Sequence, residues 1–167
     1  MAIMKGKGLR RRIRIGKIKE EDKEEAYRFC LGIIEEMGWE KKFFTDIDNL
    51  PAVFKGEREI FLLAKEEDKI IGCVGLNDLS EKQALMRRFY VAKEFRGKGL
   101  APKLFKRIKK FAKEKNYSTI VLDVFKNNFR AKRFYQKQGF IPFKPRPQKK
   151  WPDSKYPNSF DFRKFTL

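Results

Sequence analysis

A glycine-rich basic loop in front of a helical pattern is the first stretch whose residue types could do chemistry. Residues 96–101 read Arg-Gly-Lys-Gly-Leu-Ala, and no Ser, Thr, Asp or Asn stands at 98–100 to cap the helix. The first amides of a helix lack intrahelical partners and carry partial positive charge. Glycine allows close approach, and Pro102 is tolerated in a first turn. The loop suits a phosphate or pyrophosphate, although glycine spacing alone would equally fit a plain loop before a core helix.

The segments around this loop define its structural setting. A strand pattern at 83–91 precedes it, and a second strand pattern at 120–124 follows the helix. This order predicts a βαβ unit, which is almost always right-handed. The loop is neither a Rossmann fingerprint nor a P-loop, because no G-x-G-x-x-G is present and no G-K-[ST] follows.

Two motifs in this unit resemble the GNAT superfamily of acyl-CoA N-acyltransferases. The family's pyrophosphate loop reads Gln/Arg-x-x-Gly-x-Gly/Ala, and its fixed positions are filled here by Arg96, Gly99 and Ala101. Downstream, the family often carries Asn-x-x-Ala-x-x-Phe/Leu-Tyr-x-x-x-Gly-Phe. The matching residues are Asn128, Ala131, Phe134, Tyr135, Gly139 and Phe140. The resemblance covers residues 72–143 and implies an N-acetyltransferase that uses acetyl-CoA, without a metal, on a small-molecule or peptide amine.

The resemblance also implies where the cosubstrate binds. The strand before the loop and the strand after the helix splay apart in the family, so backbone groups of the first strand are left to bond the pantetheine arm. The pyrophosphate takes the loop at 96–101. The implied binding residues are Phe89, Tyr90, Val91, Arg96, Gly97, Lys98, Gly99, Leu100, Ala101, Asn128, Ala131 and Phe134.

Tyr135 is the candidate general acid. Attack of an amine on the thioester expels a CoA thiolate, which a phenol near its reference pKa can protonate. Tyr135 shares a helix face with Ala131, four positions earlier. The alternative is a core aromatic residue beside Phe134. Asn128 could cap its own helix, bond the pantetheine, or do both.

No general base is evident. Many family members place a Glu in the first splayed strand, whereas residues 85–88 here read Leu-Met-Arg-Arg. Asp78 and Glu81 lie just before that strand; a water chain or an amine that arrives neutral are the other possibilities. Arg87 or Arg88 could bind a substrate carboxylate or be surface charges. Strand alternation predicts that only one of these two faces the cleft.

The composition predicts one domain over residues 1–167 and a preference for anionic partners. Lys and Arg total 41 against 22 Asp and Glu, a formal charge of +19. This excess fits either a Lys-rich solvated surface or contact with a polyanion such as nucleic acid. Residues 1–11 are expected to be a flexible basic arm. The basic clusters are Lys5, Lys7, Arg10, Arg11, Arg12 and Arg14, and then Lys144, Arg146, Lys149, Lys150 and Trp151.

Several function classes are excluded or disfavoured. The chain has no His, so imidazole catalysis and a Ser-His-Asp triad are impossible. Cys30 and Cys73 are predicted to be small buried residues in a reducing cytoplasm. No apolar run approaches ~20 residues, so we expect no membrane span; residues 1–19 lack the apolar core of a secretion signal. Monomer and homodimer both remain open.

The periodicity predicts the elements that position the site. Together with the resemblance it indicates a mixed α/β fold: a mostly antiparallel sheet of six to seven strands with a splayed parallel pair, flanked by about four helices. We expect strands at 12–17, 59–65, 69–76, 83–91, 120–125 and 159–167. We expect helices at 20–37, 100–115 and 128–138, a short helix or loop at 43–50 closed by Pro51, and a long loop at 142–157.

Two alternatives to the transferase are open. A nucleic-acid-associated protein would use the basic clusters. A non-catalytic acyl-CoA-binding protein would explain why the first strand of the predicted pair carries no carboxylate.

Overall fold

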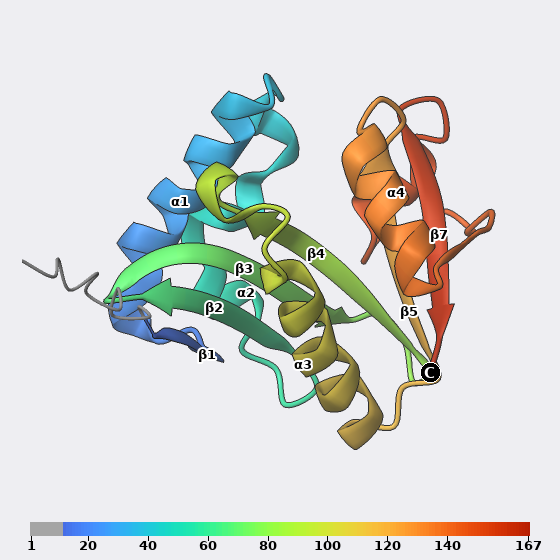
Figure 1. The fold of residues 1–167 in the computed structure, drawn as a ribbon. Helices are drawn as coiled ribbons and strands as arrows, with labels where there is room; N and C mark the ends of the chain where they lie inside the picture. The colour runs from blue at the N-terminus through green and yellow to red at the C-terminus, as the bar shows by residue number, and fades with distance from the viewer. Residues whose placement is uncertain (1–11) are drawn as a thin grey trace, which may run out of the picture.

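A single seven-stranded sheet forms the centre of the molecule (Figure 1). The computed structural model describes residues 12–167. The strand order is β1-β2-β3-β4-β5-β7-β6, and only β4 and β5 are paired in parallel. The strands are β1 Ile13–Lys17, β2 Ile60–Glu66, β3 Lys69–Asp78, β4 Gln83–Val91, β5 Thr119–Phe125, β6 Ile141–Pro142 and β7 Phe160–Thr166. The expected mixed sheet with one parallel pair is confirmed.

Helices lie on both faces of the sheet (Figure 1). They are α1 Lys23–Glu36, α2 Leu50–Val53, α3 Leu100–Glu114 and α4 Phe129–Gln138. Short 3-10 turns occur at Glu20–Asp22, Lys41–Phe43, Thr45–Asn49, Lys93–Phe95 and Pro152–Lys155. Gly38 takes a left-handed φ of 69° just after Met37, the C-cap of α1, as a helix stop requires. Pro51 does not close the second helix as expected: it lies in the first turn of α2, where its missing N–H leaves no bond unmade.

Alternating side chains of the sheet feed separate apolar clusters on its two faces. Ile120 and Leu122 pack in the cluster that includes the apolar face of α3, whereas Val121 packs in a cluster with Trp151. A third cluster joins α1 and α2 to β2 and β3. The buried cysteines Cys30 and Cys73 belong to it, with their sulfur atoms 3.9 Å apart, so their predicted burial is confirmed.

The segment at 142–157 is more structured than the expected loop. Its first residue belongs to β6, an isolated bridge joins Gln148 to Trp151, and a 3-10 turn follows. The Trp151 ring is 2% exposed and packs edge-on against Phe162, with ring centres 5.5 Å apart. A tryptophan among prolines and lysines gave no periodic signal, yet burying its ring is what attaches this segment to β5 and β7.

β4 and β5 pair only over their first residues. The parallel ladder joins residues 83–85 to 119–121 and then ends. On its other edge, β4 pairs with β3 in a register that places Val74 opposite two residues, Arg88 and Phe89. Arg88 takes φ 53°, in the left-handed region. This bulge bends β4 where the ladder with β5 ends.

Gly75, opposite Arg87 just before the bulge, is predicted to be indispensable for packing. A Cβ at this position would lie 2.5 Å from the Phe54 ring and 2.8 Å from the Phe61 ring. Gly75→Ala should therefore lower the free energy of unfolding by about 2 kcal/mol in urea titrations. Gly16→Ala in β1 is the control, because a Cβ there meets nothing within 4 Å. Equal stability of the two variants would contradict this account.

Candidate active site

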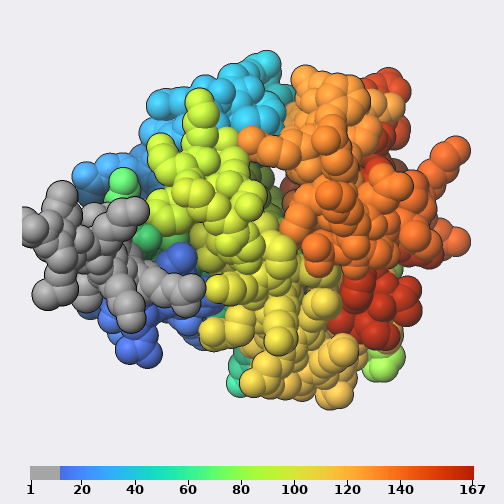
Figure 2. All heavy atoms as spheres, in the orientation of Figure 1, coloured from blue at the N-terminus to red at the C-terminus, as the bar shows by residue number. Residues whose placement is uncertain are grey.

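A cavity of about 440 Å³ opens where β4 and β5 diverge. In the space-filling view it lies between the yellow-green surface, where β4 leads into α3, and the orange surface of α4 (Figure 2). Most of the site residues predicted from the sequence line it: Arg87, Arg88, Phe89, Tyr90, Val91, Arg96, Gly97, Gly99, Leu100, Ala101, Asn128, Ala131, Phe134 and Tyr135. Lys98 does not; it is exposed, with its ammonium 6.0 Å from the centre of the Phe95 ring.

The head of α3 presents uncapped amides to this cavity. Gly99 is the N-cap residue, and no side chain bonds the first amides. Gly97 and Gly99 have φ of 73° and 88°, values that residues with a Cβ rarely adopt. The two glycines are therefore required by the backbone of the loop itself, and the open space beside each leaves the amides accessible to an anion.

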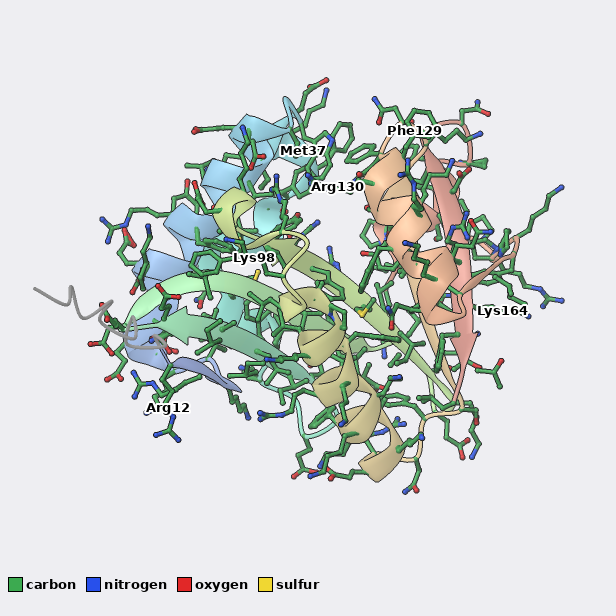
Figure 3. The ribbon with its side chains drawn as sticks, in the orientation of Figure 1. Arg12, Met37, Lys98, Phe129, Arg130 and Lys164 are labelled. Atoms are coloured by element: carbon green, nitrogen blue, oxygen red, sulfur yellow. The ribbon has the colours of Figure 1, made fainter. Side chains whose placement is uncertain are left out.

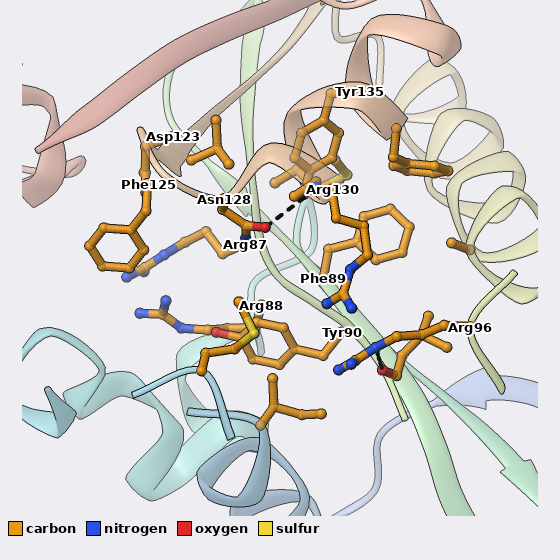
Figure 4. Close-up of a pocket in the computed structure, with 18 of the residues that line it drawn as sticks. Arg87, Arg88, Phe89, Tyr90, Arg96, Asp123, Phe125, Asn128, Arg130 and Tyr135 are labelled. Carbon is orange, nitrogen blue, oxygen red and sulfur yellow. Dashed lines mark hydrogen bonds between the residues drawn. The ribbon is translucent and has the colours of Figure 1, made fainter. Parts of the chain in front are cut away.

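Two arginine side chains face each other at the mouth of the cavity (Figure 4). Arg96 donates from Nε to the Val91 carbonyl at 2.9 Å and forms a two-pronged ion pair with Glu36. Arg130 projects from α4 toward the end of α1 near Met37 (Figure 3) and forms no ion pair with residues 12–167. Burial and the charge of Arg96 lower the pKa of Arg130. A bound anion would relieve this repulsion.

The bulge in β4 changes how its arginines are directed. Both Arg87 and Arg88 line the cavity and point to the same side (Figure 4), so the prediction that only one could do so is wrong. Alternation fails because the left-handed Arg88 adds one residue to the strand. Arg88 is bound to Asp46 through Nε and Nη and lies 4.5 Å from the centre of the Phe44 ring. Arg87 has a looser contact, 3.8 Å from Asp46.

Tyr135 and Asn128 lie on the cavity face of α4. The Asn128 side chain accepts a hydrogen bond from the Ala131 amide at 3.3 Å and thereby caps α4. Capping was one of the two roles predicted for this residue. The Tyr135 hydroxyl makes no hydrogen bond within residues 12–167. Burial first, and then the charge of Asp123, raise the pKa of Tyr135 well above the reference value of a phenol, so the expectation of a phenol near that value is wrong. The phenol therefore stays protonated across the physiological range.

The carboxylates at the cavity are not those that the sequence suggested. Asp78 is bound to Arg58 and to the Tyr117 hydroxyl, Glu81 is 88% exposed, and neither lines the cavity. Asp123 and Asp153 line it instead. Burial, followed by the charge of Asp123 and a hydrogen bond with it, raises the pKa of Asp153 to about 7.

Sequence reasoning missed other lining residues for identifiable reasons. Asp123 did carry a signal, because it interrupts an otherwise apolar strand. Asp153 carried none, because its position depends on the buried Trp151. Arg130 falls between two fixed positions of the downstream motif. The aromatic wall comes from separate segments: the Trp39 ring lies 5.6 Å from that of Phe44 and 5.0 Å from that of Phe125.

The predicted basic clusters have different outcomes. Lys5, Lys7, Arg10 and Arg11 lie outside the described residues, and Arg14 is paired with Asp68. Lys144, Arg146, Lys149 and Lys150 are exposed. Trp151 does not share this exposure: its ring is buried, and its indole N–H donates to Asp123.

Neither a metal cluster nor a membrane span is found in the part of the chain described. Over residues 12–167, no three His, Cys, Asp or Glu gather as metal ligands would. Within the same range, no helix has the length and apolar character needed to cross a bilayer.

Comparison with known proteins identifies relatives of this arrangement. The family model described as the acetyltransferase (GNAT) family matches residues 17–140. The human protein N-acetyltransferase 8 is 31% identical over 102 residues, which are 58% of this chain and 45% of that protein. The chain thus spans less than half the length of this relative.

Solved structures share the fold. A GNAT-family acetyltransferase from Staphylococcus aureus superposes with a TM-score of 0.80 at 24% identity, covering 93% of this chain and 99% of that one. PaiA N-acetyltransferase from Thermoplasma acidophilum, solved in complex with coenzyme A, gives 0.70 at 21% identity, covering 93% and 99%. At these identities, the likeness shows the fold.

The buried pair between Asp46 and Arg88 yields a pH-dependent prediction. Burial alone would raise the pKa of Asp46, but the charge and hydrogen bonds of Arg88 outweigh it and lower the pKa below 3.8. The stabilisation is thus present above the unfolded pKa and is lost as the pH falls through the folded one. Asp46→Asn should cost about 3 kcal/mol of unfolding free energy at pH 7, and less below pH 3.

Asp48→Asn is the matched control from the same 3-10 turn. The Asp48 side chain is 60% exposed and 3.6 Å from Lys41, so its loss should leave stability nearly unchanged. Urea titrations of both variants at the two pH values measure the difference. A cost for Asp46→Asn that does not vary with pH would disprove the electrostatic origin.

Proposed function

The chain belongs to the GNAT family of acetyltransferases, and we propose that it transfers an acetyl group from acetyl-CoA to a primary amine by direct attack. The observation that carries this proposal is the cavity itself: β4 and β5 separate after residue 85, directly beside the uncapped head of α3. An unpaired strand edge and an anion site therefore border one space. We further propose that this chemistry belongs to a single domain.

The proposed cosubstrate matches the groups around the cavity. Its diphosphate would take the amides at the head of α3, with Arg96 and Arg130 as the flanking cations. Its pantetheine amides would bond the edge of β4 from residue 86 to 91, which has no partner in β5. The thioester would then reach the inner cavity, where the Tyr135 hydroxyl lies without a hydrogen-bond partner in the described structure.

Tyr135 is the proposed general acid of this reaction. When the bond between the acetyl carbon and sulfur breaks, the thiolate needs a proton, and the Tyr135 phenol would supply it. Its raised pKa keeps that proton available. The hydroxyl then regains a proton from the product nitrogen or from solvent.

The acceptor is proposed to be an amine that enters past the aromatic wall at Trp39, Phe44 and Phe125. Arg87, the less tightly paired of the two arginines on the bulge, is available to a carboxylate on that amine. Arg88 is the weaker candidate for this role because Asp46 already occupies its donors.

Fewer observations support the two alternatives, a non-catalytic acyl-CoA-binding protein and a nucleic-acid-associated protein. The hypothesis of a non-catalytic protein was based on the lack of a carboxylate in β4, but two carboxylates from other segments line the cavity. Nucleic-acid binding stays a prediction that depends on the exposed lysines near 144–150 and on the arm outside the described residues; a steep salt dependence of RNA or DNA binding would be its signature.

Acetyl-CoA should stabilise the folded protein. At a ligand concentration 100 times the dissociation constant, binding adds about 2.7 kcal/mol to the unfolding free energy, which thermal denaturation would register as a clear rise in Tm. NAD and ATP at the same concentration should give little rise, because they lack the pantetheine arm. A response to all three ligands alike would contradict the assigned groove.

Tyr135→Phe should lower kcat about 100-fold while leaving the rise in Tm with acetyl-CoA nearly intact, because only the proton donor is removed. The measurement is thiol release from acetyl-CoA across amino acids, polyamines, peptides and amino sugars. Tyr156→Phe is the control, because Tyr156 is 43% exposed and does not line the cavity. Full activity of Tyr135→Phe would remove the acid assignment, and no release with any amine would favour a non-catalytic protein.

A further inference from the structure

Two carboxylates lie together in the cavity and have no part in the mechanism so far. Asp123 comes from β5, and Asp153 comes from the 3-10 turn at Pro152–Lys155. Both line the cavity, and after burial the charge of Asp123 is the main cause that raises the pKa of Asp153. Two neighbouring ionised carboxylates repel each other, so a single proton shared between them is the favoured state.

The pair is held in place by a buried anchor. The Trp151 indole N–H donates to Asp123 Oδ1 at 2.7 Å, which fixes one oxygen of that carboxylate. Ser154 Oγ accepts from the Gln148 amide at 2.9 Å and closes the segment around the tryptophan. Asp153 lies between these two anchored residues, so the backbone that carries it next to Asp123 is held by the fold.

The charges facing the pair favour a cation in the cavity. Arg87 and Arg88 approach from β4, Tyr135 is the titratable group of α4 that senses Asp123, and Asp46 is paired with Arg88. With Asp153 protonated, Asp46 and Asp123 balance the two arginines. When Asp153 ionises, this end of the cavity gains one net negative charge, which attracts an ammonium group.

We propose that Asp153 is the general base that takes the proton from the substrate ammonium, and that Asp123 is the positioning residue that holds that proton in a shared hydrogen bond. This inference rests on the proposed function. It places an acid and a base in one cavity: Tyr135 on α4 and the carboxylate pair where β5 meets the 148–155 segment.

One proton of the ammonium moves to Asp153, and the freed nitrogen lone pair bonds to the thioester carbonyl carbon. The carbonyl electrons move to oxygen and return as the carbon–sulfur bond breaks, and sulfur takes the Tyr135 proton. The product nitrogen loses its second proton, which restores the phenol, and Asp153 releases the first to solvent. One proton is released per acetyl group transferred.

The other carboxylates near the site are already paired with arginine side chains. Asp46 is bound to Arg88 through several hydrogen bonds. The hydrogen bond from Arg96, together with the charge of Arg96, lowers the pKa of Glu36. A carboxylate whose charged form is stabilised in this way is a weak base. Asp153 differs because burial and Asp123 disfavour its charge, which makes it a stronger proton acceptor near neutral pH.

The first test observes the pair without any substrate. In protein labelled with ¹³C at the aspartate carboxyl carbons, one resonance should titrate at about pH 7. It should vanish in Asp153→Asn and move to a lower pH in Asp123→Asn, where Asn can still accept from Trp151. Glu81→Gln, at an exposed carboxylate outside the cavity, should leave it unchanged. Ordinary acidic titration of every aspartate would overturn the proposal.

The pH dependence of folding stability is a second test of the carboxylate pair, and the pair predicts its direction. The folded state holds the Asp153 proton more tightly than the unfolded state, so the wild type should lose stability as the pH rises from about 4 to about 7. Asp153→Asn lacks this loss, and its Tm relative to the wild type should rise between pH 5 and pH 8. A Tm difference that is constant over that range would count against the pair.

The third test is the pH profile of kcat/KM for an amine found in the thiol-release screen. The wild type should show an acidic limb near pH 7. Asp153→Asn should lose this limb and be about 100-fold slower than the wild type between about pH 7 and pH 8, with a smaller difference at lower pH, while its acetyl-CoA stabilisation stays intact. Asp123→Asn should shift the limb to lower pH. An unchanged limb and rate in Asp153→Asn would refute the base assignment, whereas a wild type that acetylates no amine would refute the transferase proposal instead.

Discussion

The buried ion pair between Arg88 and Asp46 holds the part of β4 on which the cavity depends. A left-handed backbone costs a non-glycine residue about 1–2 kcal/mol, so the bulge at Arg88 needs support from its surroundings. Asp46 binds its guanidinium, the Phe44 ring lies against it, and the Cys73 thiol donates to the Arg88 carbonyl at 3.1 Å. With the bulge fixed, β4 bends where its ladder with β5 has ended, and the edge beyond stays unpaired.

The local charges at the site differ from the charge of the whole chain. The formal net charge is +19, which would disfavour cationic substrates if it were spread evenly. The mouth of the cavity does follow this bias, with Arg96 and Arg130 suited to phosphates. At the inner end, however, Asp123 and Asp153 line the cavity beside Arg87 and Arg88, and Asp46 is paired with Arg88. The same cavity therefore has a cationic region at its mouth and a separate region at its inner end whose carboxylates would tolerate an ammonium group.

The helices, strands and anion-binding loop were predictable from the sequence because their signals are local, whereas the splayed parallel pair came from the resemblance to the GNAT superfamily. Uncapped glycines at the head of α3, the apolar stripe of that helix and the alternation of the strands each depend on neighbours in the chain. The bulge was not predictable, since nothing in the pair Arg87-Arg88 indicates a left-handed residue. The bulge is stabilised by Asp46, which is distant in the sequence. Asp153 was missed for the same reason. Its place is set by a tryptophan that packs on strands far away in sequence, and no periodic pattern encodes that contact.

The order of strands in the sheet has a consequence for synthesis on the ribosome. β7 lies between β5 and β6, although it follows β6 in the sequence. A nascent chain that has emerged only as far as residue 158 has its glycine loop and Tyr135, but β5 has a bare edge and Trp151 lacks the Phe162 ring that it packs against. Such an intermediate exposes an unpaired strand to other chains. Pairing of β7 with β5 covers that edge and also supplies the Phe162 ring against which Trp151, the donor to Asp123, packs.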